Sequence, residues 1–380
     1  MPSFLIIASQ ANSFVGFRRP LIQALLEAGL SVHAAAPGLS SNKRVQSTLQ
    51  KMGVVLHDIP MARTGMNPYK DLQTLFALRK LMRQIQPTYS LGYTIKPVIY
   101  GGLAARLAQV PHHFALITGL GYAFMDGDHS TKRRLINHIA RRLYRVALRG
   151  AERVFFQNPD DQKLFVDSRI LSHQTPSTVV NGSGVDINDY PNTPLPPYPP
   201  LRFLLITRLI ADKGIREYVQ AATLIKEKHP EIQFDLVGPI DTNPNAIKQN
   251  ELNEWIDTGI INHHGYQSEV RPYIANCHVY VLPSYREGTP RSTLEALSMG
   301  RAVITTDAPG CRETVINGKN GYLVPTKNAT ALAQAMQQFI DNTELISTMG
   351  AYSRQLAEEK YDVRKVNEQM LRGMGIMKES

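Results

Sequence analysis

Two glutamates eight residues apart, Glu287 and Glu295, stand in the segment with the clearest chemical pattern, PSYREGTPRSTLEALSMG (283–300). The apolar run HVYVLPS that leads into this segment is typical of a buried strand, so Glu287 is expected in the loop at its carboxyl end. A helix should follow, with Thr289 as its N-cap and Pro290 in its first position. The free N–H groups and positive dipole end of such a helix bind anions. The segment therefore predicts a sugar-nucleotide site whose two carboxylates contact different hydroxyl groups.

The same segment has a structural alternative. Ser292 and Glu295 also match a capping box, in which the glutamate only satisfies the N-terminus of the helix. Gly288 favours the ligand-binding interpretation, because a residue without a side chain lets a ligand approach the backbone closely. Thr293 and Leu294, in the first turns of the helix, therefore belong to the predicted donor site.

A basic pair, Arg208 and Lys213, follows another strand-like run, LRFLLI, in the sequence ITRLIADKG (206–214). A guanidinium and an ammonium at the carboxyl end of a strand can hold a diphosphate and stabilise the negative charge that grows on it as a sugar leaves. The alternative is a solvated surface pair. Gly238 and Pro239 end the next strand-like run and are expected to line the same pocket.

Short apolar runs alternate with amphipathic helical patterns along most of the chain, which predicts an α/β fold with doubly wound parallel sheets. Its length of 380 residues favours two domains. The proline-dense stretch 190–200 is the predicted linker. Residues 1–189 and 201–355 are each expected to form a Rossmann-like domain facing a cleft, and residues 356–380 a C-terminal helix that packs back on the first domain.

The pattern Glu287-x7-Glu295, continued by GRAVITTDAPGCRETV and NGYLVP, resembles the glycosyltransferases of family 4, which have the two-domain GT-B fold. The resemblance covers most of the chain and is strongest over 204–325. It implies a retaining transferase in which Glu287 contacts the hydroxyls of the donor sugar and Glu295 those of the ribose. It also implies that Arg208 and Lys213 bind the diphosphate and that Tyr266 packs on the nucleotide base.

The stretches TIKPVIYGGLAAR, TGLGYAF and NPYKDLQTLFALRKLM resemble the bacterial subgroup that extends undecaprenyl-diphosphate-linked oligosaccharides. This subgroup implies a UDP-sugar donor, with a hexose or hexosamine, and a lipid-diphosphate-linked saccharide as acceptor. Besides the donor substrate no cofactor is expected. No metal site is expected either, because no Asp-x-Asp pair stands at the end of a predicted strand.

The first half carries weaker signals. The loop after its first strand has a single glycine, Gly16, which is expected to let the backbone approach the phosphates. Lys96 follows the strand-like run YSLGY, and Thr118, Gly119 and Gly121 follow the strand that ends in FALI. We expect Thr118 to act at the catalytic edge, and Lys96 with the two glycines to bind the acceptor. The histidine that many relatives place in this region is not matched, because His112 and His113 stand at the beginning of the strand.

The net charge of +10 belongs to the first half of the chain. Residues 1–200 contain 22 lysines and arginines against 11 acidic residues, whereas residues 201–380 contain 20 against 21. The densest basic stretch, 131–153, has the pattern of an amphipathic helix with a cationic face, as expected at an anionic membrane surface. The alternative is a solvated face over a core stripe. The arginines predicted to contact the membrane are Arg133, Arg134, Arg141, Arg142 and Arg145.

Compartment and partners follow from the same composition. Two cysteines fit a reducing compartment, and no signal peptide or membrane span is expected, which predicts a cytoplasmic protein attached to the inner face of the membrane. Nucleic acid is not an expected partner, and the sequence does not predict an oligomeric state. Two other functions stay open: a GT-B sugar-nucleotide epimerase, and a non-enzymatic adaptor that binds nucleotide sugars or polyanions.

Overall fold

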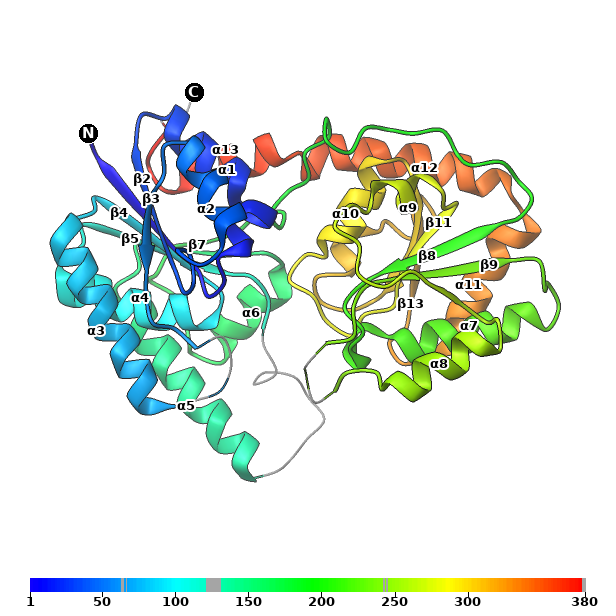
Figure 1. Ribbon diagram of the computed structural model, residues 1–380, viewed down its shortest axis with the longest axis horizontal. Helices are drawn as coiled ribbons and strands as arrows, with labels where there is room; N and C mark the ends of the chain where they lie inside the picture. The colour runs from blue at the N-terminus through cyan, green and yellow to red at the C-terminus, as the bar shows by residue number, and fades with distance from the viewer. Residues whose placement is uncertain (63–64, 66, 121–130, 242, 244, 378–380) are drawn as a thin grey trace. The chain divides into compact units, whose positions relative to one another are not determined.

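The computed structural model describes residues 1–62, 65, 67–120, 131–241, 243 and 245–377, without the side chains of 131–133. The chain forms two compact units (Figure 1), one made of Met1–Ser183 with Arg364–Ser380 and the other of Gly184–Val363. Each unit holds one parallel sheet with helices on both faces, so the predicted pair of doubly wound domains is confirmed.

The sheet of the first unit has seven parallel strands in the order β3-β2-β1-β4-β5-β6-β7. The strands are β1 (Ser3–Ile7), β2 (Ser31–Ala36), β3 (Val55–Asp58), β4 (Tyr89–Tyr93), β5 (His112–Ile117), β6 (Arg153–Phe156) and β7 (Ser177–Val179). The order of the strands reverses between β1 and β4. In such sheets ligands bind beyond the carboxyl ends of the strands near this reversal.

Alternate residues of the buried strands pack against opposite faces of the sheet. Phe4 and Ile6 of β1 pack with the helices of one face, whereas Leu5 and Ile7 pack with those of the other. The first face is covered by α1 (Arg19–Glu27), which follows the π-helical turn η1 (Phe14–Arg18), and by α2 (Lys43–Lys51). The C-terminal helix α13 (Val363–Gly373) packs on the same face after the chain returns from the second unit. The second face is covered by α3 (Pro68–Ile85), α4 (Ile95–Ala108), α5 (Thr131–Leu148) and α6 (Pro159–Asp167). Continuous apolar strands are what a sheet buried on both faces requires.

The sheet of the second unit has six parallel strands in the order β10-β9-β8-β11-β12-β13. They are β8 (Arg202–Ile206), β9 (Gln233–Val237), β10 (Asn262–His263), β11 (Val279–Leu282), β12 (Ala302–Thr306) and β13 (Gly321–Val324). Its helices are η3 (Ala211–Lys213), α7 (Ile215–Lys226), α8 (Gln249–Asp257), α9 (Arg271–Ala275), α10 (Arg291–Ser298), η4 (Arg312–Thr314), α11 (Ala329–Asp341), α12 (Glu344–Leu356) and η5 (Ala357–Tyr361). One core cluster joins this sheet to its helices.

The proline-rich stretch 190–200 belongs to the second unit, whose first residue is Gly184. A buried arginine, Arg301, holds it there by donating to the carbonyl oxygens of Thr193 at 2.9 Å and Pro194 at 3.1 Å. The C-terminal helix α13 belongs mostly to the first unit, because Met370 and Leu371 lie in its core. The chain therefore passes between the units twice, at 183–184 and at 363–364.

Candidate active site

The loop after β11 and the start of α10 form the centre of the candidate site. Helix α10 begins at Arg291 with Pro290 as its N-cap, so the predicted N-cap at Thr289 is wrong. The backbone of Pro290 is extended, with ψ of 111°, which leaves the helix to begin one residue later. Ser292 does not form the capping box, because its hydroxyl accepts a 2.6 Å hydrogen bond from Tyr280. Among the described residues no side chain caps the first turn of α10, and a helix N-terminus of this kind can bind an anion.

Lys213 and Glu287 meet at this edge of the sheet. The Nζ of Lys213 lies 2.5 Å from Oε1 of Glu287, and both side chains are largely shielded from solvent. Lys213 ends the short helix η3, which packs on the loop after β11 through a 2.9 Å bond from the Tyr285 amide to the Asp212 carbonyl. The turn at Gly214 has a positive φ of 70°, and a Cβ there would lie 2.0 Å from the carbonyl oxygen of Pro283. Two residues that are 74 positions apart are therefore brought together by tight backbone packing.

The other side of the Glu287 loop is braced by Pro309 and Gly310, which follow β12. The Glu287 amide donates to the Pro309 carbonyl at 2.9 Å. A Cβ on Gly310 would lie 2.3 Å from the Glu287 carbonyl oxygen, so only glycine fits here. Sequence reasoning did not single out these two residues, although a Pro-Gly pair after a buried strand signals a tight turn.

Arg208 and Gly238 lie beyond the ends of β8 and β9. Arg208 is half exposed, and its Nη1 lies 2.7 Å from Oδ2 of Asp241, a partner that the sequence analysis missed. Gly238 has a φ of +143°, and a Cβ there would lie 1.7 Å from the carbonyl oxygen of Thr207. The carbonyl of Gly238 accepts a 2.9 Å hydrogen bond from Nε2 of His263. The close approach of the two strand ends therefore requires glycine at 238.

Glu295 is buried, unlike Glu287. It lies 2.9 Å from the Nε of Arg291 one turn before it, and it also contacts Tyr190 from the proline-rich stretch. Burial raises the pKa of this carboxyl above its ordinary value, although Arg291 opposes the shift. Beside it the hydroxyl of Thr293 is buried without a hydrogen-bond partner among the described residues. Tyr266, expected near the base, is 70% exposed and so is not a core residue.

In the first unit Lys96 does not present a free charge. Its Nζ lies 2.7 Å from Oδ1 of Asp71 in α3, and both side chains are about nine-tenths buried. Gly16 lies in the helical turn η1 rather than in a loop, and a Cβ on it would have nothing within 4 Å. Thr118 and Gly119 directly follow β5, and Gly119 has a positive φ of 105°.

Three more residues of the first unit were considered in the sequence, namely Gly121, His112 and His113. Gly121 lies outside the described residues. His112 and His113 begin β5, at the edge opposite to the carboxyl ends, as expected. His112 binds Glu152 at 2.7 Å, and His113 is buried against the hydroxyl of Ser90 at 2.9 Å. Burial lowers the pKa of His113 to about 4, so its ring is neutral.

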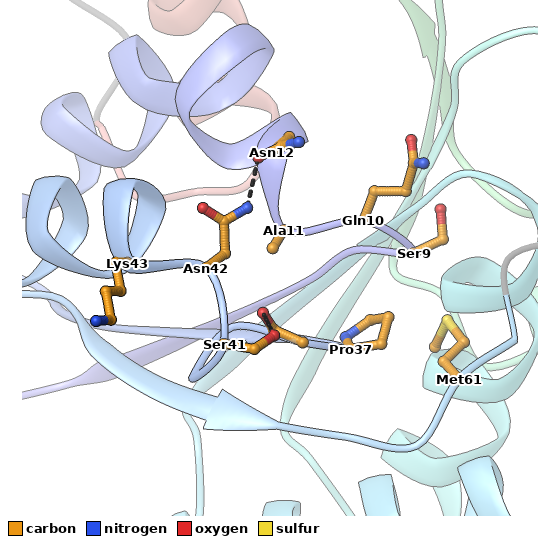
Figure 2. Close-up of a pocket in the computed structure, with 10 residues that line it drawn as sticks. Ser9, Gln10, Ala11, Asn12, Pro37, Ser41, Asn42, Lys43 and Met61 are labelled. Carbon is orange, nitrogen blue, oxygen red and sulfur yellow. Dashed lines mark hydrogen bonds between the residues drawn. The ribbon is translucent and has the colours of Figure 1, made fainter.

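A hollow of about 600 Å³ opens at the carboxyl ends of β1 and β2 (Figure 2). It is lined by Ser9, Gln10, Ala11, Asn12, Pro37, Gly38, Ser41, Asn42, Lys43 and Met61. The Asn42 side chain caps α2 by accepting from the Val45 amide at 3.3 Å, and it donates to Asn12 at 2.7 Å. Hydroxyl and amide groups of this kind bind the hydroxyls of a sugar. Of its polar residues, the sequence analysis had considered only the segment after β1.

Helix α5 carries its basic residues on a face that is also partly apolar. Arg134 and Arg142 are exposed, and Arg141 and Arg145 are half-buried. The apolar stripe of this helix lies in the core only in part, as expected: Ala147 is buried and Leu143 half-buried, whereas Leu135 is 60% exposed and Ile139 is also exposed. The side chain of Arg133 lies outside the described residues. Among the described residues no helix is both long and apolar enough to span a membrane.

The fold and the site define a GT-B glycosyltransferase with two Rossmann-like domains. A family model for glycosyl transferases group 1 matches residues 200–342, and one for glycosyl transferase 4-like domains matches residues 5–158. One glycosyltransferase model therefore matches each half of the chain, which confirms the resemblance seen in the sequence. An enzyme of this class is favoured over both the epimerase and the adaptor.

Two curated relatives are similar to this chain over most of its length. The N,N'-diacetylbacillosaminyl-diphospho-undecaprenol alpha-1,3-N-acetylgalactosaminyltransferase of Campylobacter jejuni is 26% identical over 88% of each chain. The UDP-Gal:alpha-D-GlcNAc-diphosphoundecaprenol alpha-1,3-galactosyltransferase of Escherichia coli is 25% identical over 76% of this chain and 75% of its own.

Solved structures show the same fold over the whole chain. A glycosyltransferase from Rickettsia africae superposes with a TM-score of 0.78 at 18% identity, covering 100% of this chain and 99% of its own. Anabaena HepE in complex with UDP superposes with a TM-score of 0.75 at 17% identity, covering 99% of this chain and 100% of its own.

Proposed function

We propose that this enzyme transfers a hexose or N-acetylhexosamine from a UDP-sugar to an undecaprenyl-diphosphate-linked saccharide, with retention of anomeric configuration and without a metal ion. The observation that carries the proposal is the Lys213–Glu287 pair beside the uncapped start of α10. An ammonium and a helix N-terminus suit a diphosphate, and a carboxylate at the same edge suits the hydroxyls of the sugar.

The substrates are inferred from the relatives. The names of both curated relatives describe transfer to diphospho-undecaprenol-linked sugars, one of them from UDP-galactose. HepE, with the same fold, is seen with UDP. In the first unit the hollow beside β1 offers neutral amides and hydroxyls with one cation, Lys43, which fits a saccharide better than a phosphate.

The proposed reaction follows a front-face route. The bond between the anomeric carbon and the phosphate oxygen breaks as the acceptor oxygen bonds to the same face of that carbon. The acceptor proton passes to the departing phosphate oxygen, and the UDP leaves with it. Lys213, Arg208 and the amides of α10 would stabilise the charge on the diphosphate, with Glu287 orienting the sugar and Glu295 the ribose. Thr118 and Gly119, which follow β5, are the candidates at the acceptor side.

The direct test is sugar transfer by the purified chain. A panel of nucleotide sugars is first ranked by thermal stabilisation, and the best donor is then assayed with an undecaprenyl-diphosphate-linked N-acetylhexosamine. We expect transfer that persists in EDTA and gives the donor's anomeric configuration by NMR. Glu287→Ala should abolish it, whereas Glu254→Ala, an exposed glutamate of α8, should not. Normal transfer by the Glu287 variant, or an inverted product, would refute the assignment.

We further propose that the first unit works at the anionic surface of the inner membrane leaflet. On α5, Leu135, Ile139 and Val146 are exposed among Arg134 and Arg142, which is typical of a helix lying in the interface. On α3, the large apolar side chains of Tyr69, Leu72 and Phe76 are also exposed on one face. Each surface cation contributes roughly 1 kcal/mol to such binding.

Cosedimentation with vesicles tests this attachment. The chain should bind vesicles that contain phosphatidylglycerol and should be released by salt. Replacing both Arg134 and Arg142 by glutamine should weaken binding, and replacing the exposed Lys51 and Lys163 by glutamine should not. Equal binding by all variants would contradict the role of α5.

A further inference from the structure

A second hollow of the first unit lies at the amino edge of its sheet, opposite to the carboxyl ends of the strands. The end of α5, the residues just ahead of β6 and the segment 169–176 ahead of β7 enclose about 1070 Å³. It takes no part in the proposed transfer. The residues of this unit that we assign to the donor or the acceptor all lie at the carboxyl ends of strands, whereas this hollow lies at their amino ends.

Basic side chains without partners line this hollow. Arg149, Arg169 and His173 are exposed, and none of them makes a side-chain hydrogen bond or an ion pair with any residue that the structure describes. The acidic residue among the lining residues, Glu152, is already held by His112 at 2.7 Å. Among the described residues that line the hollow, positive charge therefore exceeds negative charge.

The hollow is held in shape by its own framework. Arg145 of α5 donates from Nε to the carbonyl of Arg169 at 2.6 Å and from Nη2 to that of Ser168 at 3.5 Å. Ile170 and Leu171, next in the chain, are buried in the core. Arg169 itself has a left-handed backbone with φ of 52°, which a non-glycine residue adopts at a cost. The hydrogen bonds from Arg145 and the burial of Ile170 and Leu171 therefore hold the backbone from which the Arg169 side chain projects.

We propose that this hollow binds the phosphate groups of an anionic ligand. Guanidinium groups from two segments, Arg149 and Arg169, can each donate a fork of hydrogen bonds to phosphate oxygens, with His173 beside them. Leu148 and Pro176 add apolar lining. The headgroup of an anionic phospholipid and a free polyphosphate share this chemistry. The lipid form of the proposal rests on the proposed attachment to the membrane, whereas the phosphate site itself does not.

The experiment compares two double variants that remove the same charge. In Arg149→Gln/Arg169→Gln the site is neutralised, and in Lys51→Gln/Lys163→Gln two exposed lysines outside the hollow, on α2 and α6, are replaced. Binding of inorganic pyrophosphate and of monomeric dihexanoyl phosphatidylglycerol is measured by calorimetry. We expect saturable binding whose Kd rises at least tenfold in the first variant and changes less than twofold in the second.

The two probes identify the source of the phosphate. Tighter binding of the short-chain lipid supports a headgroup site, and tighter binding of pyrophosphate supports a soluble polyphosphate. The proposal fails if wild type binds neither probe saturably, or if both double variants weaken binding equally, as diffuse surface charge would predict.

Transfer to a water-soluble acceptor analogue separates this inference from the proposed function. The Arg149→Gln/Arg169→Gln variant should transfer at the wild-type rate, and a loss of transfer would overturn the proposal of a separate site. If wild type itself transfers no sugar, the proposed function fails while the binding measurement still decides the phosphate site.

Discussion

The two sheets end in carboxyl edges of different character. In the second unit this edge carries opposite charges in contact, Lys213 with Glu287 and Arg208 with Asp241. In the first unit the hollow beside β1 is lined mainly by hydroxyl and amide groups. The second unit thus presents an ionic region beside α10, whereas the first presents a nearly neutral hollow beside β1. The contrast suits a charged diphosphate on one unit and an uncharged saccharide on the other.

Glycine shows the same contrast. Gly238 in the second unit stands where a Cβ would collide with the carbonyl of Thr207, whereas a Cβ on Gly16 in the first unit would meet nothing within 4 Å. Close backbone packing therefore shapes the edge of the second unit at this position, and no such packing requires glycine at 16.

The largest expected effect comes from testing these two glycines. Gly238→Ala should lower the free energy of unfolding by more than about 4 kcal/mol, because the Cβ would overlap a backbone carbonyl at a left-handed φ. Gly16→Ala should raise it by up to about 1 kcal/mol, since alanine is favoured over glycine in a helical turn. Urea denaturation measures both. Equal midpoints for the two variants would mean that the close approach at Gly238 is not required.

The buried pair in the first unit gives the next effect. Lys96→Met alone should destabilise the fold by about 3–5 kcal/mol, because it leaves Asp71 buried without its partner. Lys96→Met combined with Asp71→Leu should recover most of the loss, which chemical denaturation would show. The stable double variant then tests whether Lys96 also binds the acceptor. A wild-type KM for the acceptor in that variant would make the pair purely structural.

The sequence was sufficient for features that follow from periodicity. Strand ends in a parallel sheet meet at one edge, so the positions of Arg208, Lys213 and Glu287 beyond β8 and β11 could be predicted. The partner of Arg208 could not, because Asp241 lies in an irregular segment where no repeat fixes the direction of a side chain.

Local sequence signals could not decide which of two neighbouring residues is the N-cap of α10. Thr289 and Pro290 both fit the start of a helix, and the extended backbone of Pro290 decides for the latter. Proline content predicted a linker at 190–200. It did not predict attachment to one unit, which depends on Arg301, a residue more than 100 positions away that is fully buried.

A lysine exchange on each edge tests the contrast in charge. Lys213→Ala should reduce kcat about 100–1000-fold, the usual loss when a group that stabilises a developing negative charge is removed. Lys43→Ala, in the hollow of the first unit, should leave kcat unchanged and raise the KM for the acceptor only. Steady-state kinetics with both substrates varied separates the two. Similar losses of kcat in both variants would mean that the edges do not divide the chemistry in this way.

The smallest effect concerns the pH dependence of stability, and it arises at Glu295. Burial raises the pKa of this carboxyl in the folded state above its unfolded value of 4.5. Its contribution to stability is therefore fully present below pH 4.5 and is lost as the pH rises through the folded pKa. Glutamine cannot ionise, so Glu295→Gln should not show this loss.

We accordingly expect wild type to lose stability relative to Glu295→Gln as the pH is raised from 4 to 7, measured as the difference in free energy of unfolding. Glu254→Gln, an exposed carboxyl in the same unit, is the matched control and should follow wild type. A constant difference between wild type and Glu295→Gln across this range would show that Arg291 and Tyr190 fully compensate the buried charge. If Glu295→Gln raises the KM for the donor without changing stability, the result supports the proposed contact between Glu295 and the ribose. A buried carboxylate that stays ionised is stabilised when the hydroxyls of a ligand donate hydrogen bonds to it.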